Sequence, residues 1–110
     1  MSDVKSLKLR AGICKRLLKE LKSYETEVEK DAARVEEMKA SGADSHDIKQ
    51  QENVLAESRM MVPDCRKRLE AAYYDLESTV DGARDDTALV DTSEFKEALE
   101  ILAEASQVVG

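Results

Sequence analysis

The residues able to do catalytic or metal chemistry are few in this 110-residue sequence. The single histidine, His46, has no cysteine or acidic pair at the spacing of a metal site or a catalytic triad. Cys14 and Cys65 fall on apolar helical faces, which is typical of small buried residues in a reducing compartment rather than of a metal site or a disulfide. We therefore expect a protein that is not an enzyme and that uses no cofactor and no metal.

Four aspartates near the C-terminal third invite comparison with a calcium-binding loop. Such a loop requires glycine at its sixth position, and counting from Asp81 that position is Asp86. The run, which continues through Asp85 to Asp91, is therefore predicted to be a solvated linker. The sequence also lacks the glycine-rich loop that holds phosphates and the turn that presents a nucleophilic serine.

Charge is distributed unevenly along the chain, whose net charge is −7. Residues 1–22 carry a net charge of +5, and residues 71–110 carry −8. The overall negative charge argues against nucleic-acid binding, because a phosphate backbone requires a basic surface. No apolar run approaches the roughly 20 residues of a membrane span, and no secretory signal is recognisable at the N-terminus. A cytoplasmic protein that does not enter membranes is expected.

Apolar residues that recur every seven positions predict two long helices. The helix over about residues 3–40 would bury Leu7, Cys14, Leu21, Val28 and Val35. The helix over about residues 45–80 would bury Ile48, Leu55, Val62, Leu69 and Leu76. Gly42 suits the left-handed position that closes the first helix, and Asp81 with Gly82 is expected to close the second.

Pro63, the only proline, lies inside the second of these helices. A proline in a helix interior costs ~3 kcal/mol, because it removes one backbone hydrogen bond and clashes with the preceding turn. Val62 and Leu69 nevertheless continue the same apolar seam on both sides of it. We therefore expect one helix kinked at Pro63 rather than two helices joined by a loop.

A third, shorter helix is expected over about residues 91–108, after a polar linker at residues 83–90. Asp91 and Glu94 have the spacing of a capping box. The apolar stripe of this helix is predicted to contain Phe95, Leu99, Leu102, Ser106 and Val109, with Ala98 and Ala105 between them. The predicted fold is all-α: one domain, residues 1–110, forming an antiparallel up-down-up three-helix bundle.

The same periodicity turns several apolar and basic side chains away from the predicted core. Such a cluster near a basic end is typical of a docking surface, although ordinary solvated surface is the alternative. Gly12 also lies on this outward side of the first helix. The candidate partner-binding residues are Leu9, Lys15, Lys19, Met60, Pro63, Asp64, Arg66, Lys67 and Tyr74. The basic members, together with Lys8, would speed the encounter with an acidic partner.

Two longer motifs resemble the tubulin-specific chaperone A family, also called tubulin-folding cofactor A. They are DIKQQ at residues 47–51 and ESRMMVPDCRKRLEAAY at residues 57–73. Weaker likenesses are Gly12 with KRL at residues 15–17, and EFKEA at residues 94–98. Residues 81–86 match the family pattern poorly.

The resemblance implies a chaperone of tubulin folding that captures β-tubulin and holds it in a quasi-native state. It also implies a functional link to tubulin-folding cofactors C, D and E, a place in the cytoplasm near the microtubule cytoskeleton, and either a monomer or a homodimer. Two other interpretations stay open. One is a homodimeric coiled coil that pairs through an exposed seam, and the other is a basic amphipathic helix on a membrane surface.

Overall fold

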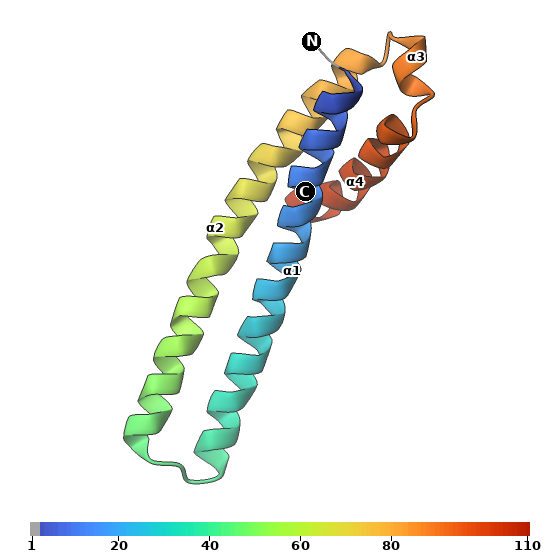
Figure 1. Ribbon diagram of the computed structural model, residues 1–110. Coiled ribbons are helices and arrows are strands. Elements are labelled where there is room, and N and C mark those ends of the chain that lie inside the picture. Colours follow the sequence, from blue (N-terminus) through green and yellow to red (C-terminus); the bar gives the residue numbers. More distant parts are fainter. Residues whose placement is uncertain (1–2) are drawn as a thin grey trace. The chain divides into compact units, whose positions relative to one another are not determined.

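The computed structural model describes residues 3–110, and all of its regular elements are helices. They are α1 (Val4–Ala40), α2 (Ser45–Ala83), α3 (Thr87–Val90) and α4 (Ser93–Val109) (Figure 1). The all-α prediction is therefore confirmed, while the number of helices is four rather than the three expected. The fold divides into two compact units: unit 1 contains residues 3–19 and 66–110, and unit 2 contains residues 20–65.

Unit 2 is a hairpin formed by the end of α1 and the beginning of α2. Gly42 has a φ of 74°. The amide of Ala43 donates to the carbonyl of Met38 at 3.0 Å, and the amide of Gly42 donates to that of Lys39 at 3.3 Å. These two bonds form a Schellman motif, so the predicted closing role of Gly42 is confirmed.

The two helices of unit 2 run antiparallel, as two polar contacts between them show. The Ser58 hydroxyl donates to the Asp31 carboxylate at 2.6 Å, and Lys39 Nζ lies 3.9 Å from a Glu52 carboxylate oxygen. The predicted burial of Leu21, Val35 and Leu55 is confirmed. Val28, Ile48 and Val62, which were also predicted to be buried, are only half-buried. The buried residues of this unit are Leu21, Asp31, Val35, Leu55 and Cys65.

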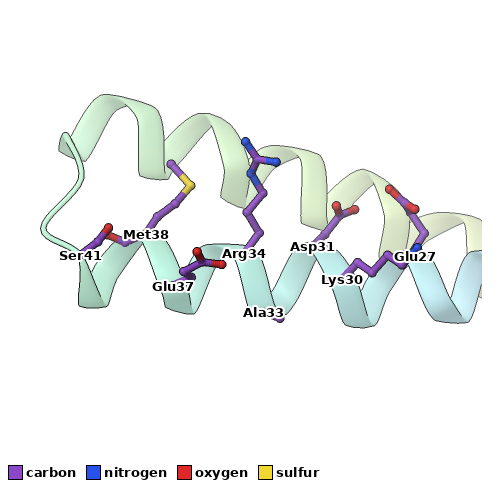
Figure 2. Close-up of a pocket in the computed structure, with 8 residues that line it drawn as sticks. All are labelled: Glu27, Lys30, Asp31, Ala33, Arg34, Glu37, Met38 and Ser41. Atoms are coloured by element: carbon purple, nitrogen blue, oxygen red, sulfur yellow. The ribbon is translucent and has the colours of Figure 1, made fainter.

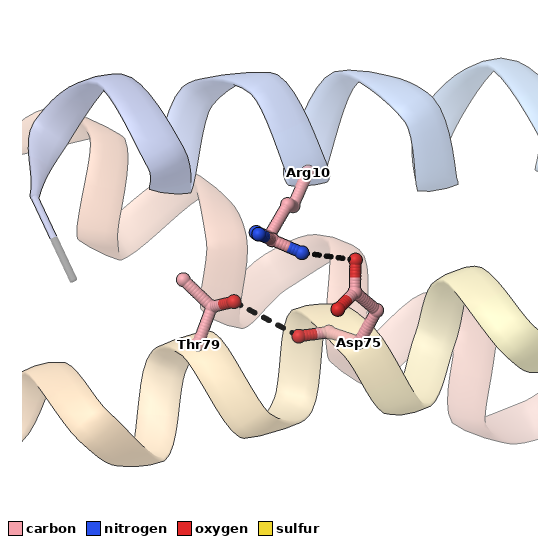
Figure 3. A network of polar contacts seen from close by, with 3 residues as sticks. All are labelled: Arg10, Asp75 and Thr79. Carbon is pink, nitrogen blue, oxygen red and sulfur yellow. Dashed lines mark hydrogen bonds and ion pairs between the residues drawn. The ribbon is translucent and has the colours of Figure 1, made fainter. Parts of the chain in front are cut away.

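Unit 1 combines the first part of α1, the last part of α2, and both α3 and α4. An ion pair joins Arg10 of α1 to Asp75 of α2, whose backbone carbonyl also accepts a 2.9 Å hydrogen bond from the Thr79 hydroxyl (Figure 3). A second ion pair, with 3.6 Å between Lys15 Nζ and Glu97 Oε1, joins α1 to α4. The core of this unit contains Leu7, Ala11, Cys14, Leu18, Leu69, Leu76, Val80, Ala83, Leu89, Phe95, Ala98, Ile101 and Ala105.

Helix α1 begins and ends close to the predicted residues, but α2 extends beyond its predicted end. The prediction that Asp81 and Gly82 close α2 is wrong. The helix continues to Ala83, whose side chain is completely buried, and Gly82 does not have a positive φ. Burial of Val80 and Ala83 on the core side favours one further turn. Pro63 lies inside α2, as predicted.

The predicted linker at residues 83–90 contains the short helix α3. The Asp86 carboxylate accepts hydrogen bonds from the amides of Ala88 and Leu89 at 3.0 and 3.3 Å, and Leu89 is buried. Asp86 is therefore an N-cap residue, for which a carboxylate oxygen is well suited. The expectation of a solvated linker is wrong at this end.

Helix α4 begins after Thr92, so the predicted cap at Asp91 is wrong. The Thr92 side chain accepts a hydrogen bond from the Phe95 amide at 3.2 Å, and its hydroxyl donates to the Leu89 carbonyl at 2.6 Å. One side chain therefore ends α3 and starts α4. The apolar face also differs from the prediction: Ile101 is buried, whereas Leu99 and Ser106 are exposed.

Candidate protein-binding surface

The chemistry-bearing side chains do not gather into a cluster that could bind a metal ion within residues 3–110. His46 is exposed, and its Nε2 lies 3.3 Å from Nε2 of Gln50 on the next turn. Both cysteines are buried and free, as predicted. Burial, followed by the nearby Glu104 carboxylate, raises the pKa of the Cys14 thiol, so this thiol is a poor nucleophile at neutral pH.

Exposed apolar side chains are the distinctive surface feature of both units. In unit 1, Leu9 is 63% exposed and Tyr74 is 53% exposed. In unit 2, Met60 is 71% exposed. Side chains of this size are normally covered at least in part, so their exposure makes them candidates for contact with another protein.

The predicted outward orientation of the candidate residues agrees with their exposure. Beyond Leu9, Met60 and Tyr74, the exposed members are Lys15, Lys19, Pro63, Asp64, Arg66 and Lys67. The structure places Leu9, Lys15, Lys19, Arg66, Lys67 and Tyr74 in unit 1, and Met60, Pro63 and Asp64 in unit 2. Their role as a binding site stays a prediction.

Unit 1 does not bring Leu9 and Tyr74 to the same hollow. Leu9 lines a shallow hollow of about 330 Å³ with Asp3, Lys5 and Ser6 at the beginning of α1. Tyr74 lines another, of about 220 Å³, with Tyr73, Glu77, Ser106, Val109 and Gly110, where α2 meets the end of α4. Two separate contact points are therefore available on this unit.

The Tyr74 hollow has an ordered aromatic wall. The rings of Tyr73 and Tyr74 meet edge to face with their centroids 5.3 Å apart, and the Tyr73 hydroxyl donates to the Glu77 carboxylate at 3.2 Å. Desolvation, followed by the negative charge of Glu77, raises the pKa of Tyr73. The phenol therefore stays protonated and fixes the wall against which Tyr74 stands.

Two hollows of unit 2 lie along its hairpin. The larger, of about 720 Å³, lies along α1 and is lined by Glu27, Lys30, Asp31, Ala33, Arg34, Glu37, Met38 and Ser41 (Figure 2). Its lining is mostly charged, which favours a polar or hydrated occupant. The smaller, of about 360 Å³, has Val28, Val62 and Pro63 as its apolar part, with Glu25, Glu29 and Arg59 around them. Pro63 therefore contributes to an apolar depression rather than to a flat surface.

The candidate basic residues differ in how they are engaged. Lys15 forms an ion pair with Glu97, so its positive charge is partly neutralised within unit 1. In residues 3–110, Lys19 and Lys67 have no ion-pair or hydrogen-bond partner. The sequence did not identify the pairing of Lys15, because an ion pair between residues 82 positions apart depends on how α1 and α4 pack within unit 1.

Several exposed apolar residues were missed from sequence. Ile13, Val54 and Met61 are exposed, as is Leu99, which had been assigned to the core. Ile13 and Val54 each lie one position before a seam residue, Cys14 and Leu55 respectively. Their exposure could have been predicted from this offset. A residue one position from a seam turns about 100° away from it around the helix.

Comparison with known proteins identifies the family. A family model described as tubulin binding cofactor A matches residues 2–102. The chain belongs to this family. Tubulin-folding cofactor A of Arabidopsis thaliana is 59% identical over 80 residues, which are 73% of this chain and 71% of that protein. Tubulin-specific chaperone A of Homo sapiens is 42% identical over 99 residues, 90% of this chain and 89% of that protein.

Solved structures of the cofactor A family have the same fold. The crystal structure of tubulin folding cofactor A from Arabidopsis thaliana matches with a TM-score of 0.86 at 47% identity, covering 94% of this chain and 95% of that one. The structure of human tubulin chaperone cofactor A matches with a TM-score of 0.77 at 39% identity, covering 94% and 97%. The resemblance inferred from the motifs around Pro63 is thereby confirmed.

No helix within residues 3–110 has an apolar stretch long enough to cross a membrane.

Proposed function

We propose that this chain is a tubulin-folding chaperone that captures β-tubulin and stabilises it in a quasi-native state before the αβ heterodimer assembles. Membership of the tubulin binding cofactor A family is the observation that carries this proposal. The named relatives, a tubulin-folding cofactor and a tubulin-specific chaperone, support it. The protein would work by stoichiometric binding rather than catalysis, in the cytoplasm near the cytoskeleton, and upstream of tubulin-folding cofactors C, D and E.

The proposed binding surface combines exposed apolar contacts with basic charge. Met60, Tyr74 and Leu9 would supply apolar area, and their exposure supports that role. Lys15, Lys19, Arg66 and Lys67 would attract an acidic client, and Pro63 and Asp64 lie in the same stretch of α2 as Met60. Apolar area contributes to affinity, whereas the charges mainly increase the association rate.

The architecture proposed for this activity is one domain. In it, α1, α2 and α4 would form an antiparallel up-down-up bundle, and α2 would be kinked at Pro63. Proline has no amide hydrogen to donate to the carbonyl of Arg59, and its ring crowds the preceding turn, which supports the kink. A kink there would set the direction of the surface around Met60.

The test of this surface is a triple replacement, Met60→Glu, Lys67→Glu and Tyr74→Glu. We expect capture of purified β-tubulin to weaken by about tenfold or more, because apolar contact is lost and a positive charge is reversed. Capture is measured by co-sedimentation or by fluorescence binding. Circular dichroism must show unchanged helicity, and glutamate substitutions at exposed Lys49, Asn53 and Ala56 provide a matched control.

The function itself is tested by affinity capture from cell lysate with mass spectrometry. Recovery of β-tubulin is expected, and its consistent absence would contradict the proposal. A homodimeric coiled coil is the second candidate, favoured by the exposed Val54, Met60 and Met61 of unit 2. Sedimentation at several concentrations separates the two candidates, since a stable monomer at micromolar concentration contradicts the dimer.

A further inference from the structure

The outer face of α1 in unit 1 combines features that the fold of that unit does not require. Leu7, Ala11 and Cys14 face the core and are buried. Helical geometry places Leu9, Gly12, Ile13 and Arg16 on the opposite side, with Lys8 and Lys19 at one edge. We call these six residues the Gly12 face. Leu9 and Ile13 are 63% and 38% exposed, so the side of the face away from Lys8 and Lys19 is apolar.

Gly12 is the least expected residue on this face. Glycine inside a helix is destabilising relative to alanine, because it loses more backbone freedom on folding. Gly12 does not have a positive φ, and a Cβ built on it would meet no heavy atom within 4 Å. Nothing in the described chain therefore requires the absence of a side chain. The result is an open position beside Leu9 and Ile13, here called the notch, and an open position of this kind lets another backbone approach closely.

The charges of the Gly12 face are also unfavourable to the isolated helix. Residues 4–19 contain six basic residues and no acidic one. Basic residues three or four positions apart on one helix, such as Arg16 and Lys19, repel one another. Within residues 3–110, Lys8, Arg16 and Lys19 have no hydrogen-bond or ion-pair partner. The face therefore offers uncompensated positive charge beside two exposed apolar side chains.

We infer that the Gly12 face docks an acidic amphipathic helix of the client protein. The client backbone would cross α1 at Gly12, its apolar side chains would contact Leu9 and Ile13, and its carboxylates would pair with Lys8, Arg16 and Lys19. Charge complementarity selects an acidic segment, and a helix suits a site where the missing side chain of Gly12 lets two helix backbones approach closely. This inference rests on the proposed function and specifies which part of the client is recognised.

The test compares Gly12→Ala and Gly12→Leu with the wild-type chain in binding to purified β-tubulin. Both substitutions should raise the melting temperature, since each improves helix propensity at an exposed position. Gly12→Leu should weaken binding by about tenfold or more because its side chain fills the notch, and Gly12→Ala should weaken it less. Ala103→Leu, at an exposed position on α4 of the same unit, is the matched control and should leave binding unchanged.

Opposite changes in stability and affinity are the decisive result, because a purely structural glycine would not produce them. If Gly12→Leu binds within about twofold of wild type and of Ala103→Leu, the inference is overturned. Should wild type fail to capture β-tubulin, the proposed function fails instead. If Gly12→Leu removes a concentration-dependent dimer seen by sedimentation and leaves tubulin capture intact, the face belongs to a second copy, and the client-helix assignment is wrong.

Discussion

At the scale of single residues, the contact between Asp31 and Ser58 is the polar exception in an apolar seam. Asp31 is only 7% exposed, and the Ser58 hydroxyl donates to it at 2.6 Å across the hairpin of unit 2. A buried polar group is inexpensive only while it is hydrogen-bonded. The pair therefore favours the one register of α1 against α2 in which the two side chains meet.

Replacing Ser58 by alanine should destabilise the protein, because it removes this donor from a buried carboxyl group. The expected loss is about 1–3 kcal/mol in the free energy of unfolding, measured by urea denaturation. The double variant Asp31→Leu with Ser58→Ala should recover most of that loss, since an apolar pair leaves no polar group unsatisfied. Equal stability of Ser58→Ala and wild type would show that the bond contributes nothing to the hairpin.

The exposure of the candidate binding residues could be predicted from the seven-residue period of the sequence. The ion pairs that they form could not. A repeat of seven places Met60 and Tyr74 opposite the seam, and both are exposed. The ion pair between Lys15 and Glu97 depends on the face of α4 that meets α1. The stripe predicted for α4 correctly contained Phe95, Ala98 and Ala105, but it included Leu99, which is exposed, and omitted Ile101, which is buried.

At the scale of elements, the two long helices could be predicted because each has five apolar residues at a spacing of seven, which fixes the side of the helix that faces the core. Helix α3 was not, since four residues are too few to show a period. Asp86 was the residue from which α3 could have been predicted, because its carboxylate caps the amides two and three positions later. Its place in a run of aspartates suggested solvated linker instead. Local capping therefore determines the structure of this segment, for which the hydrophobic pattern makes no prediction.

The start of α4 provides a test at this scale. Thr92→Ala should lower the free energy of unfolding by about 1–2 kcal/mol, because it removes the cap on the Phe95 amide and the bond to the Leu89 carbonyl. Asp91→Ala, at the position first expected to cap the helix, is the matched control and should change stability little. Thermal and urea unfolding would measure both. Greater destabilisation by Asp91→Ala than by Thr92→Ala would contradict the assignment of the cap.

At the scale of the whole molecule, the distribution of charge matters more than its sum. The net charge of −7 predicts repulsion from an acidic client. The six basic residues of positions 4–19 predict local attraction to the same client. If repulsion dominates, the association rate rises with salt, and if local attraction dominates, it falls with salt. Measuring the association rate at several ionic strengths therefore distinguishes the two.

We expect the association rate with β-tubulin to fall as salt rises from about 50 to 300 mM, because screening removes the attraction of the basic segment for an acidic client. Stopped-flow fluorescence measures the rate. The double variant Lys8→Gln with Lys19→Gln should bind more slowly at low salt and depend less on salt, while Lys49→Gln, an exposed control in unit 2, should behave as wild type. An association rate that rises with salt would mean that overall charge governs the encounter, and the basic segment would then have no part in attracting the client.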